Sequence, residues 1–421
     1  MHLLFLLPDF PYPASTGGRL KVFNILKYMS RKHRCDILCF GETDLLNIDN
    51  FLEQLPTVRV LDVLPPVSGT TKRLGVLWHL IRLLPPSLAS FSDRKYASAV
   101  SRALTAADYD LIHFDIVNMA QHLPPGVRLS TLHSPNDATS LIYSRMADKT
   151  AWSLAKIKLL ISVRLLQRYE RQIYPLFDMV HVVSREDALY LQSLAATINV
   201  SVVPIAVDEA FLGDPNLVDA KQEMPDTGSP TIICNGNLGN PAIADGVREF
   251  LNGALPLILK LWPAAKLLVL GQNIDERLRT QLLEAPSTEF LTWVDDYRAF
   301  LAKADVVLVP DHVGAPGAKT RTLQAMGLGL PVVGTHTAFA GIPFVNHEHG
   351  LSYKTMPECA ERICALLGDK KMRKILAANA RQLVADEFSL SVVGPKYEQM
   401  YFDAVANFDA RGPIHVRSAV D

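Results

Sequence analysis

The chain has 421 residues, of which 49% are hydrophobic and 20% are charged. At about 100–200 residues per domain, this length predicts two folded domains, and the composition excludes a disordered chain. The formal net charge of -1 gives the whole protein no attraction for polyanions, so DNA and RNA are not predicted partners.

An apolar run at residues 3–7 opens the chain and is predicted to form a buried strand. It has no basic segment before it and ends at Pro8 and Asp9, so it is too short for a signal peptide or a membrane span. The five cysteines are scattered without paired spacing, which predicts buried, reduced thiols in a cytosolic protein.

The first half of the chain alternates apolar strands with helices. Residues 2–7 (strand), 8–18 (loop), 19–31 (helix) and 35–40 (strand) form the first repeat of this pattern, which predicts a parallel sheet. Further short strands are predicted at residues 58–64, 109–114, 128–132, 179–183 and 200–204. Together they complete a doubly wound α/β domain near residue 205.

A polar stretch at residues 214–230 separates this domain from a second one of the same kind. The pattern restarts with strands predicted at residues 231–234, 266–270, 289–292, 305–309 and 331–335. In open α/β sheets, ligands bind beyond the carboxyl ends of the strands. Two such domains facing each other predict a ligand cleft between them.

Residues 71–84 and 152–171 have an apolar face, carry lysine and arginine but almost no acid, and contain Trp78 and Trp152. Basic amphipathic helices with aromatic residues suit the surface of an anionic membrane. The alternative is a core-packing helix with a basic outer face, and periodicity alone does not separate the two.

Lys319 and Arg321 are predicted to lie in the first turn of a helix, after a loop that contains Gly314 and Gly317. The positive end of the helix dipole disfavours cations there by roughly 0.3–1 kcal/mol each, and the free N–H groups of a helix start bind phosphate. The pattern therefore predicts a site for a diphosphate. The alternative is that both side chains extend into water.

A similar cationic helix start follows the first strand, where Gly17 and Gly18 precede Arg19 and Lys21. Glycines let a ligand approach the main chain closely. A glycine pair alone is more often a turn, but two cationic helix starts on loops expected to line one cleft favour a shared anion.

Five segments carry a resemblance to a known family. They are Pro-x-Pro-x-x-x-Gly-Gly-Arg at residues 11–19, and residues 182–188, 203–208, 236–241 and 317–335. In order and spacing they resemble GT-B glycosyltransferases of the family 4 type, also called group 1 glycosyltransferases. The resemblance spans nearly the whole chain.

The resemblance implies two facing Rossmann-like domains with an interdomain cleft. Residues 1–208 would bind the acceptor, residues 209–393 would bind a nucleotide-sugar donor, and residues 394–421 would form a helix that crosses back to the first domain. It also implies an enzyme that uses no metal or other cofactor, with the nucleoside-diphosphate sugar as a co-substrate.

The resemblance also assigns roles to single residues. Lys319 and Arg321 would contact the donor diphosphate, and Gly17 and Gly18 would face it from the other domain. The loop at Gly236 and Asn237 would contact the donor, and Val294 would present main-chain atoms to the base. His133, at the end of the predicted strand 128–132, would bind a sugar hydroxyl or take the acceptor proton. The alternative for His133 is a structural histidine that caps a loop.

Two positions depart from the family pattern. Family 4 enzymes commonly carry a Glu-x7-Glu motif, where the first carboxylate contacts the donor sugar and the second holds the ribose. Pro316 and Gln324 occupy those positions here. Gln324 keeps a hydrogen-bond acceptor for the ribose, whereas Pro316 offers no equivalent, which leaves the donor sugar and the stereochemical outcome open.

The sequence thus predicts a cytoplasmic glycosyltransferase, peripheral to the inner membrane surface, that transfers a sugar to a hydroxyl of a glycan or lipid-linked acceptor. Lys319 and His133 are its predicted catalytic residues. Two other hypotheses remain. One is a catalytically silent scaffold or activator in a polysaccharide-synthesis complex, and the other is a sugar-nucleotide epimerase.

Overall fold

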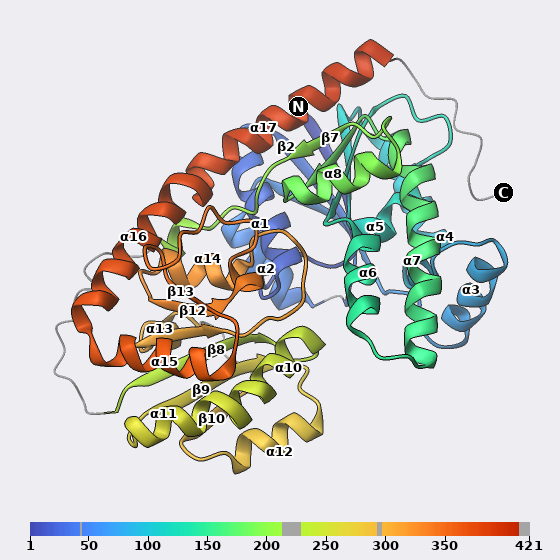
Figure 1. The fold of residues 1–421 in the computed structure, drawn as a ribbon. Coiled ribbons are helices and arrows are strands. Elements are labelled where there is room, and N and C mark those ends of the chain that lie inside the picture. Colours follow the sequence, from blue (N-terminus) through green and yellow to red (C-terminus); the bar gives the residue numbers. More distant parts are fainter. Residues whose placement is uncertain (43, 213–228, 293–296, 412–421) are drawn as a thin grey trace. The chain divides into compact units, whose positions relative to one another are not determined.

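The computed structural model describes residues 1–42, 44–212, 229–292 and 297–411. The chain divides into two compact units (Figure 1). Unit 1 contains Met1–Pro204 and the C-terminal helix from Val393, and unit 2 contains Ile205–Val392. The predicted domain boundaries lay after residues 208 and 393. The binding roles predicted for the two domains stay predictions.

Unit 1 is built on a seven-stranded sheet in the order β3-β2-β1-β4-β5-β6-β7, and every pair of neighbours is parallel. Its first strand in the chain lies inside the sheet and is fully buried from Leu3 to Leu7, as expected for a strand covered on both faces. The strands are β1 (His2–Leu7), β2 (Arg34–Phe40), β3 (Val58–Leu64), β4 (Leu111–Asp115), β5 (Ser130–Asn136), β6 (Met179–Val182) and β7 (Val200–Val202).

Helices cover both faces of this sheet. Apolar residues of α4, α7 and α8 pack on one face, and on the other face Tyr401 of α17 lies against Phe5 with ring centroids 6.2 Å apart. The helices of unit 1 are α1 (Gly17–Met29), α2 (Leu45–Gln54), α3 (Gly69–Ile81), α4 (Arg94–Ala106), α5 (Ile116–Met119), α6 (Thr139–Lys149), α7 (Leu154–Ile173), α8 (Arg185–Leu194) and α17 (Leu390–Arg411).

Unit 2 is built on a six-stranded sheet in the order β10-β9-β8-β11-β12-β13, which is also parallel throughout. The strands are β8 (Thr231–Asn237), β9 (Lys266–Gln272), β10 (Thr288–Leu291), β11 (Val306–Val309), β12 (Val332–Thr335) and β13 (Leu351–Tyr353).

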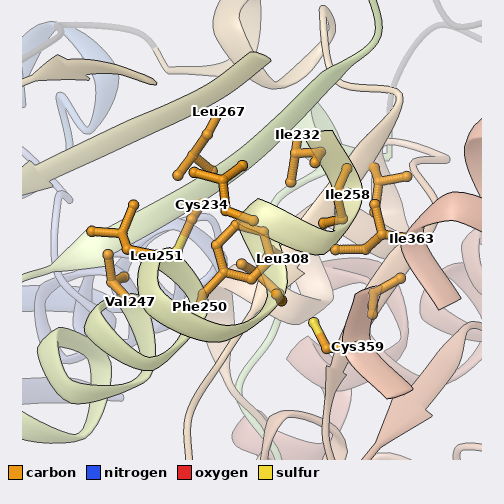
Figure 2. Packing of buried hydrophobic residues seen from close by; sticks show 14 of the residues in the cluster. Ile232, Cys234, Val247, Phe250, Leu251, Ile258, Leu267, Leu308, Cys359 and Ile363 are labelled. Atoms are coloured by element: carbon orange, nitrogen blue, oxygen red, sulfur yellow. The ribbon is translucent and has the colours of Figure 1, made fainter. Parts of the chain in front are cut away.

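Two layers of helices enclose the sheet of unit 2. On one face, Phe250 and Ile258 pack toward Leu308 and Cys359, as Figure 2 shows. On the other face, Leu323 and Met326 of α14 join the core. The helices of unit 2 are α10 (Pro241–Glu249), α11 (Leu255–Leu261), α12 (Glu276–Glu284), α13 (Arg298–Leu301), α14 (Thr320–Gly327), α15 (Met356–Gly368) and α16 (Lys370–Phe388).

The predicted fold class, two parallel α/β sheets, is confirmed. The sequence pattern missed β13, a three-residue strand too short for periodicity to mark. It also ended β5 at residue 132, four residues before the strand ends at Asn136. Among the described residues, no helix is both apolar and long enough to cross a bilayer.

Candidate functional site

In the sheet of unit 2, the loops that follow two neighbouring strands lead to opposite sides. The chain runs from β8 outward through β9 to β10 on one side, and from β11 through β12 to β13 on the other. Neighbouring β8 and β11 therefore form the topological switch point, beyond which open α/β sheets bind ligands. The loop after β8 leads to α10, and residues 310–319 lead from β11 to α14.

Gly236 and Arg321 meet at this switch point. A Cβ atom built on Gly236 would lie 2.5 Å from Nη1 of Arg321, so the guanidinium lies directly against the main chain of β8. Gly236 also has φ +156°, a backbone conformation that side chains rarely adopt. The backbone conformation favours glycine here, and a larger residue would displace the guanidinium of Arg321. The structure therefore brings together two predicted donor-binding residues that are far apart in sequence.

Arg321 is held by an ion pair with Asp311, and only 12% and 5% of the two side chains are exposed. Burial lowers the pKa of Arg321 to about 10, so it keeps its charge at neutral pH. Nε of Arg321 is buried and makes no hydrogen bond, so one donor of this guanidinium has no partner in the structure. Sequence reasoning missed Asp311, although an acid directly after an apolar strand is a recognisable signal at a strand's carboxyl end.

Lys319 is the N-cap residue of α14, and the first turn of that helix contains no acid. Its Nζ donates to the carbonyl oxygens of Ala315 and, at 2.9 Å, Gly317. The ammonium is thus turned back onto its own loop in this structure. The alternative that this side chain extends into water does not apply, because Lys319 is half-buried.

Gln324 lies one turn further along α14 and is 3% exposed. Its Oε1 accepts a hydrogen bond of 2.7 Å from the hydroxyl of Tyr297. Tyr297 was not predicted from the sequence. The side chain that replaces a family carboxylate is therefore fixed by a phenol, and a ribose contact by Gln324 stays a prediction.

Asn237 ends β8 and shapes the turn that follows. Its Oδ1 accepts hydrogen bonds from the backbone N–H of Gly239 at 3.0 Å and from Nδ2 of Asn273 at 3.2 Å. The residue itself is exposed. It lies beside Gly236 as predicted from the chain, whereas Val294, the predicted base contact, lies outside the described residues.

In unit 1, Gly17 and Gly18 form the start of α1, after the N-cap residue Thr16. A Cβ atom on Gly18 would meet nothing within 4 Å, so internal packing does not require glycine there. Arg19 pairs with Asp9 through Nη2 at 2.5 Å. Contact of either glycine with a donor stays a prediction.

Lys21 does not extend into a site. It is fully buried, and its Nζ donates to Oδ1 of Asp115 at 2.6 Å, to Oγ of Ser134 at 2.7 Å and to the side chain of Asn136. Burial alone would raise the pKa of Asp115, but Lys21 and His113 hold that pKa below its ordinary value. The prediction that Lys21 helps to bind an anionic ligand is therefore wrong, because its charge is already neutralised internally.

The position predicted for His133 is also wrong. It lies in the middle of β5 and not at its end, and the ring is fully buried. Its ring centroid is 4.6 Å from that of Tyr174 and 4.9 Å from that of Phe177, and Nδ1 lies 3.2 Å from the carbonyl oxygen of Phe114. Burial lowers the pKa of His133 to about 3. In this structure it is a neutral core histidine that does not cap a loop, and its predicted contact with a sugar stays a prediction.

Within the described ranges, no three His, Cys, Asp or Glu side chains gather in the manner of a metal site. The candidate site is thus the carboxyl edge of unit 2, formed by Gly236, Asn237, Lys319, Arg321 and Gln324, with Asp311 and Tyr297 supporting it.

Comparison with known proteins shows which family the segment around this site resembles. Residues 229–369 match the model of the family described as "Glycosyl transferases group 1". These residues include β8, the switch point and α14. This segment is therefore similar to group 1 glycosyltransferases, and the fold of the chain is GT-B.

Two curated relatives are similar to part of the chain. The capsular polysaccharide biosynthesis glycosyltransferase CapM of Staphylococcus aureus is 27% identical over 173 residues, 39% of this chain and 45% of that protein. The N-acetyl-alpha-D-glucosaminyl L-malate synthase of Bacillus anthracis is 27% identical over 158 residues, 36% of this chain and 40% of that protein. The chain thus spans less than half the length of the curated relatives it matches.

Three solved structures share the fold over almost the whole chain. Sucrose-phosphate synthase from Thermosynechococcus elongatus has a TM-score of 0.69 at 15% identity, covering 96% of this chain and 100% of that one. WaaG, a glycosyltransferase involved in lipopolysaccharide biosynthesis, has a TM-score of 0.66 at 15% identity, covering 94% and 99%. Anabaena Alr3699/HepE in complex with UDP-glucose has a TM-score of 0.64 at 16% identity, covering 95% and 99%.

Proposed function

We propose that the protein transfers a sugar from a nucleoside-diphosphate sugar to a hydroxyl group of a glycan or lipid-linked acceptor. The observation that carries the proposal is the contact of Arg321 with Gly236 at the switch point of unit 2, inside the segment that matches group 1 glycosyltransferases. A structure of HepE, which has the same fold, contains UDP-glucose. A UDP-sugar is therefore the first donor to test.

The reaction breaks the bond between the anomeric carbon and the diphosphate, and the electron pair stays on the phosphate oxygen. The acceptor oxygen forms the new bond to the anomeric carbon and releases its proton. Negative charge thus develops on the leaving diphosphate, where preorganised donors stabilise the transition state most. We infer that Lys319, the start of α14 and Arg321 supply these donors.

In this scheme, Lys319 exchanges the carbonyl oxygens of Ala315 and Gly317 for phosphate oxygens. A phosphate is a better partner for an ammonium than a neutral carbonyl, because charge-assisted hydrogen bonds are about twice as strong. Arg321 keeps its pair with Asp311 and offers its remaining N–H groups. The proposal gives Lys319 the catalytic role and Arg321 a binding role.

The remaining predicted residues complete the donor site. We infer that Asn237 and Val294 contact the nucleotide, that Gln324 lies near the ribose, and that Gly17 and Gly18 approach the diphosphate. Gly18 supports this, since packing leaves open space around it. The resemblance also implies transfer without a metal, so activity is expected to survive EDTA.

The process and location are inferred from the relatives and the surface. CapM is named for capsular polysaccharide biosynthesis and WaaG for lipopolysaccharide biosynthesis, so we infer a role in polysaccharide biosynthesis. We place the reaction in the cytoplasm, at the inner surface of the membrane, where a lipid-linked acceptor would be presented.

Calorimetry with a panel of nucleoside diphosphates tests the donor site, followed by an assay of transfer and hydrolysis with the sugar nucleotide that binds. Replacing Lys319 by alanine is expected to lower the rate by roughly 10²–10³, as loss of one donor to a developing anion does. Lys374→Ala is the control, because Lys374 is an exposed lysine of α16 and should leave the rate unchanged.

Other outcomes identify the alternatives. If no nucleoside diphosphate binds, the proposal fails and the silent-scaffold hypothesis is favoured. If a sugar nucleotide is converted to its epimer in the absence of acceptor, the protein is an epimerase. Equal loss in Lys319→Ala and Lys374→Ala would contradict the role given to α14.

A further inference from the structure

Helix α3 shows its large apolar side chains to solvent and not to the core. Leu74, Leu77, Trp78 and Ile81 follow the i, i+3, i+4, i+7 spacing of one helix face and are 40% to 73% exposed. The face that docks on the protein is made instead of small or polar residues. Gly75 lies against Ala89, with a Cβ built there 3.3 Å from that of Ala89, and His79 is 2% exposed.

This orientation is the reverse of a normal amphipathic helix, which buries its apolar stripe. The neighbouring segment that receives α3 is the short 3-10 helix Pro86–Phe91. Figure 1 shows α3 at the periphery of unit 1, outside the helices that cover the sheet. Four large apolar side chains on one exposed helix face form a patch that soluble proteins usually reserve for binding.

The start of α7 has the same character. Trp152, Leu154, Ile157 and Ile161 are 45% to 78% exposed, and on a helix the last three share one face. The core-facing side chains of α7 begin further along, with Val163, Leu165 and Leu166. The apolar stripe at the start of α7 therefore points away from the face that packs on unit 1.

Charge identifies the partner of these two stripes. The segment from residue 63 to 92 contains no acid, and its charged residues are Lys72, Arg73 and Arg82. The segment from residue 149 to 169 also contains no acid, and its charged residues are Lys149, Lys156, Lys158, Arg164 and Arg168. Because neither segment contains an acid, both carry a net positive charge in a chain whose net charge is -1.

The cations lie beside the apolar residues. The guanidinium of Arg82 lies 4.6 Å from the ring centroid of Trp78, and Nζ of Lys156 lies 5.3 Å from that of Trp152. A shallow hollow lined by Lys72 and Arg73 opens at the start of α3. Tryptophan next to a cation matches the interface of a bilayer, where the ring lies at the headgroup level and the charge contacts lipid phosphate.

We propose that unit 1 docks on an anionic lipid surface through the outward stripes of α3 (Leu74, Leu77, Trp78 and Ile81) and of the start of α7 (Trp152, Leu154, Ile157 and Ile161). The apolar side chains enter the boundary between headgroups and acyl chains, and the flanking lysines and arginines bind lipid phosphates. This inference deepens the proposed function. Only the suggestion that the acceptor is lipid-linked rests on that function. The lipid contact itself depends on the surface alone.

Flotation of the full chain with vesicles tests the proposal, using phosphatidylcholine alone and phosphatidylcholine with 30% phosphatidylglycerol. Binding to the anionic vesicles is expected, and raising the salt from about 0.05 to about 0.5 M should weaken it because salt screens surface charge. The variant Leu77→Ser/Ile81→Ser should weaken binding at least about tenfold, since it removes two inserted side chains. These residues are exposed, so folding should persist.

The matched control is Leu261→Ser/Leu283→Ser, which removes two leucines of unit 2 that are 71% and 68% exposed. It should float like the unchanged protein. The charge reversal Lys156→Glu/Lys158→Glu should abolish the preference for anionic vesicles and leave the far-ultraviolet circular dichroism spectrum unchanged.

Three results would overturn the proposal. They are equal flotation with both vesicle types, no flotation with either, and a stripe variant that changes the oligomeric state in the absence of lipid, which would assign the stripes to a second copy of the chain. Lys319→Ala should float normally. Failure of lipid binding therefore leaves the transferase proposal standing, and failure of sugar transfer leaves lipid binding standing.

Discussion

Lys21 in unit 1 and Arg321 in unit 2 look alike in the sequence and differ in the structure. Each is a cation near the start of a helix that follows a glycine-containing loop, and each pairs with an aspartate. Lys21 is closed in by Asp115 and the carboxyl end of β5 and has no exposed surface. Arg321 instead lies against the bare main chain of Gly236 and keeps a donor that makes no hydrogen bond.

The difference teaches that a cationic helix start has two uses. In unit 1 the cation, Lys21, stabilises the fold by linking α1 to the ends of β4 and β5. In unit 2 the cation Arg321 has an Nε that makes no hydrogen bond, and the proposed function gives it an anionic ligand. A buried pair is costly to break but not an anchor for ligands, so the two residues should respond differently when they are changed.

The strongest way to break this comparison is Lys21→Met. It leaves Asp115 buried without its cation, and breaking a buried pair in this way costs about 3–5 kcal/mol. The loss should appear as faster hydrogen exchange in peptides that cover β4 and β5, because unit 1 and unit 2 need not unfold together.

Two controls accompany this variant. Arg19→Met removes a partly exposed pair and should cost less than about 1 kcal/mol. The double variant Lys21→Met/Asp115→Leu removes both charges and should recover most of the loss. If Lys21→Met lowered the free energy of unfolding as little as Arg19→Met does, Lys21 would not have the structural role described here.

The second-largest expected effect is that low pH destabilises unit 1 more than unit 2. Burial lowers the pKa of His122 to about 4 and of His133 and His181 to about 3, all in unit 1. Because the folded state disfavours protonation, their contribution is present above about pH 6.5 and is lost as pH falls toward the folded values. At pH 5 the cost is roughly 2 kcal/mol for each histidine.

Glu170 opposes this trend, because burial raises its pKa to about 7, and it offsets roughly one of the three histidines. Unit 2 has no buried histidine in its described residues. Hydrogen exchange at pH 7 and pH 5, corrected for the intrinsic rates, should therefore show unit 1 opening first. Equal loss of protection in β4 and β11 would count against this assignment.

The sequence could predict features that depend on neighbouring residues, but not those that depend on contacts between distant segments. Strands such as residues 3–7 and 305–309 were predicted because continuous apolar runs mark buried parallel strands. The end of β5 was missed because Ser134, Pro135 and Asn136 are polar or helix-breaking. Pairing of Ser134 with β4 and of Asn136 with β6 extends the strand through them. That error placed His133 at a strand end.

The candidate site divides in the same way. Gly236 and Lys319 belong to local patterns and could be predicted from the sequence. The pairing of Arg321 with Asp311 and of Gln324 with Tyr297 depends on tertiary packing, which spacing does not encode. The basic, apolar segment 71–84 was visible in the sequence, but whether its apolar face points inward or outward required the structure.

A smaller change sharpens the account of Gly236. Gly236→Ala should cost about 1–2 kcal/mol, because the backbone is in a conformation that side chains rarely adopt, and should displace the guanidinium of Arg321. We expect binding of the donor nucleotide to weaken about tenfold by calorimetry, an effect of about 1.4 kcal/mol.

Gly126→Ala is the matched control for this variant. Gly126 has φ +67°, and a Cβ atom built there meets nothing within 4 Å. The substitution carries a backbone cost without a displaced neighbour, so nucleotide binding should not change. Normal binding in Gly236→Ala would show that Arg321 does not need its present position to hold the donor.

The smallest effect is expected from His133→Leu. The ring lies between Tyr174 and Phe177, and its buried Nε2 makes no hydrogen bond, so an apolar side chain of similar volume should change the free energy of unfolding by less than about 1.5 kcal/mol at pH 7. At pH 5 the variant should be more stable than the unchanged protein, because one buried proton acceptor is gone. Sugar transfer should continue at a similar rate. A fall of 10²-fold or more, the size typical of a lost general base, would return His133 to the chemistry and show that unit 1 opens to expose it during the reaction.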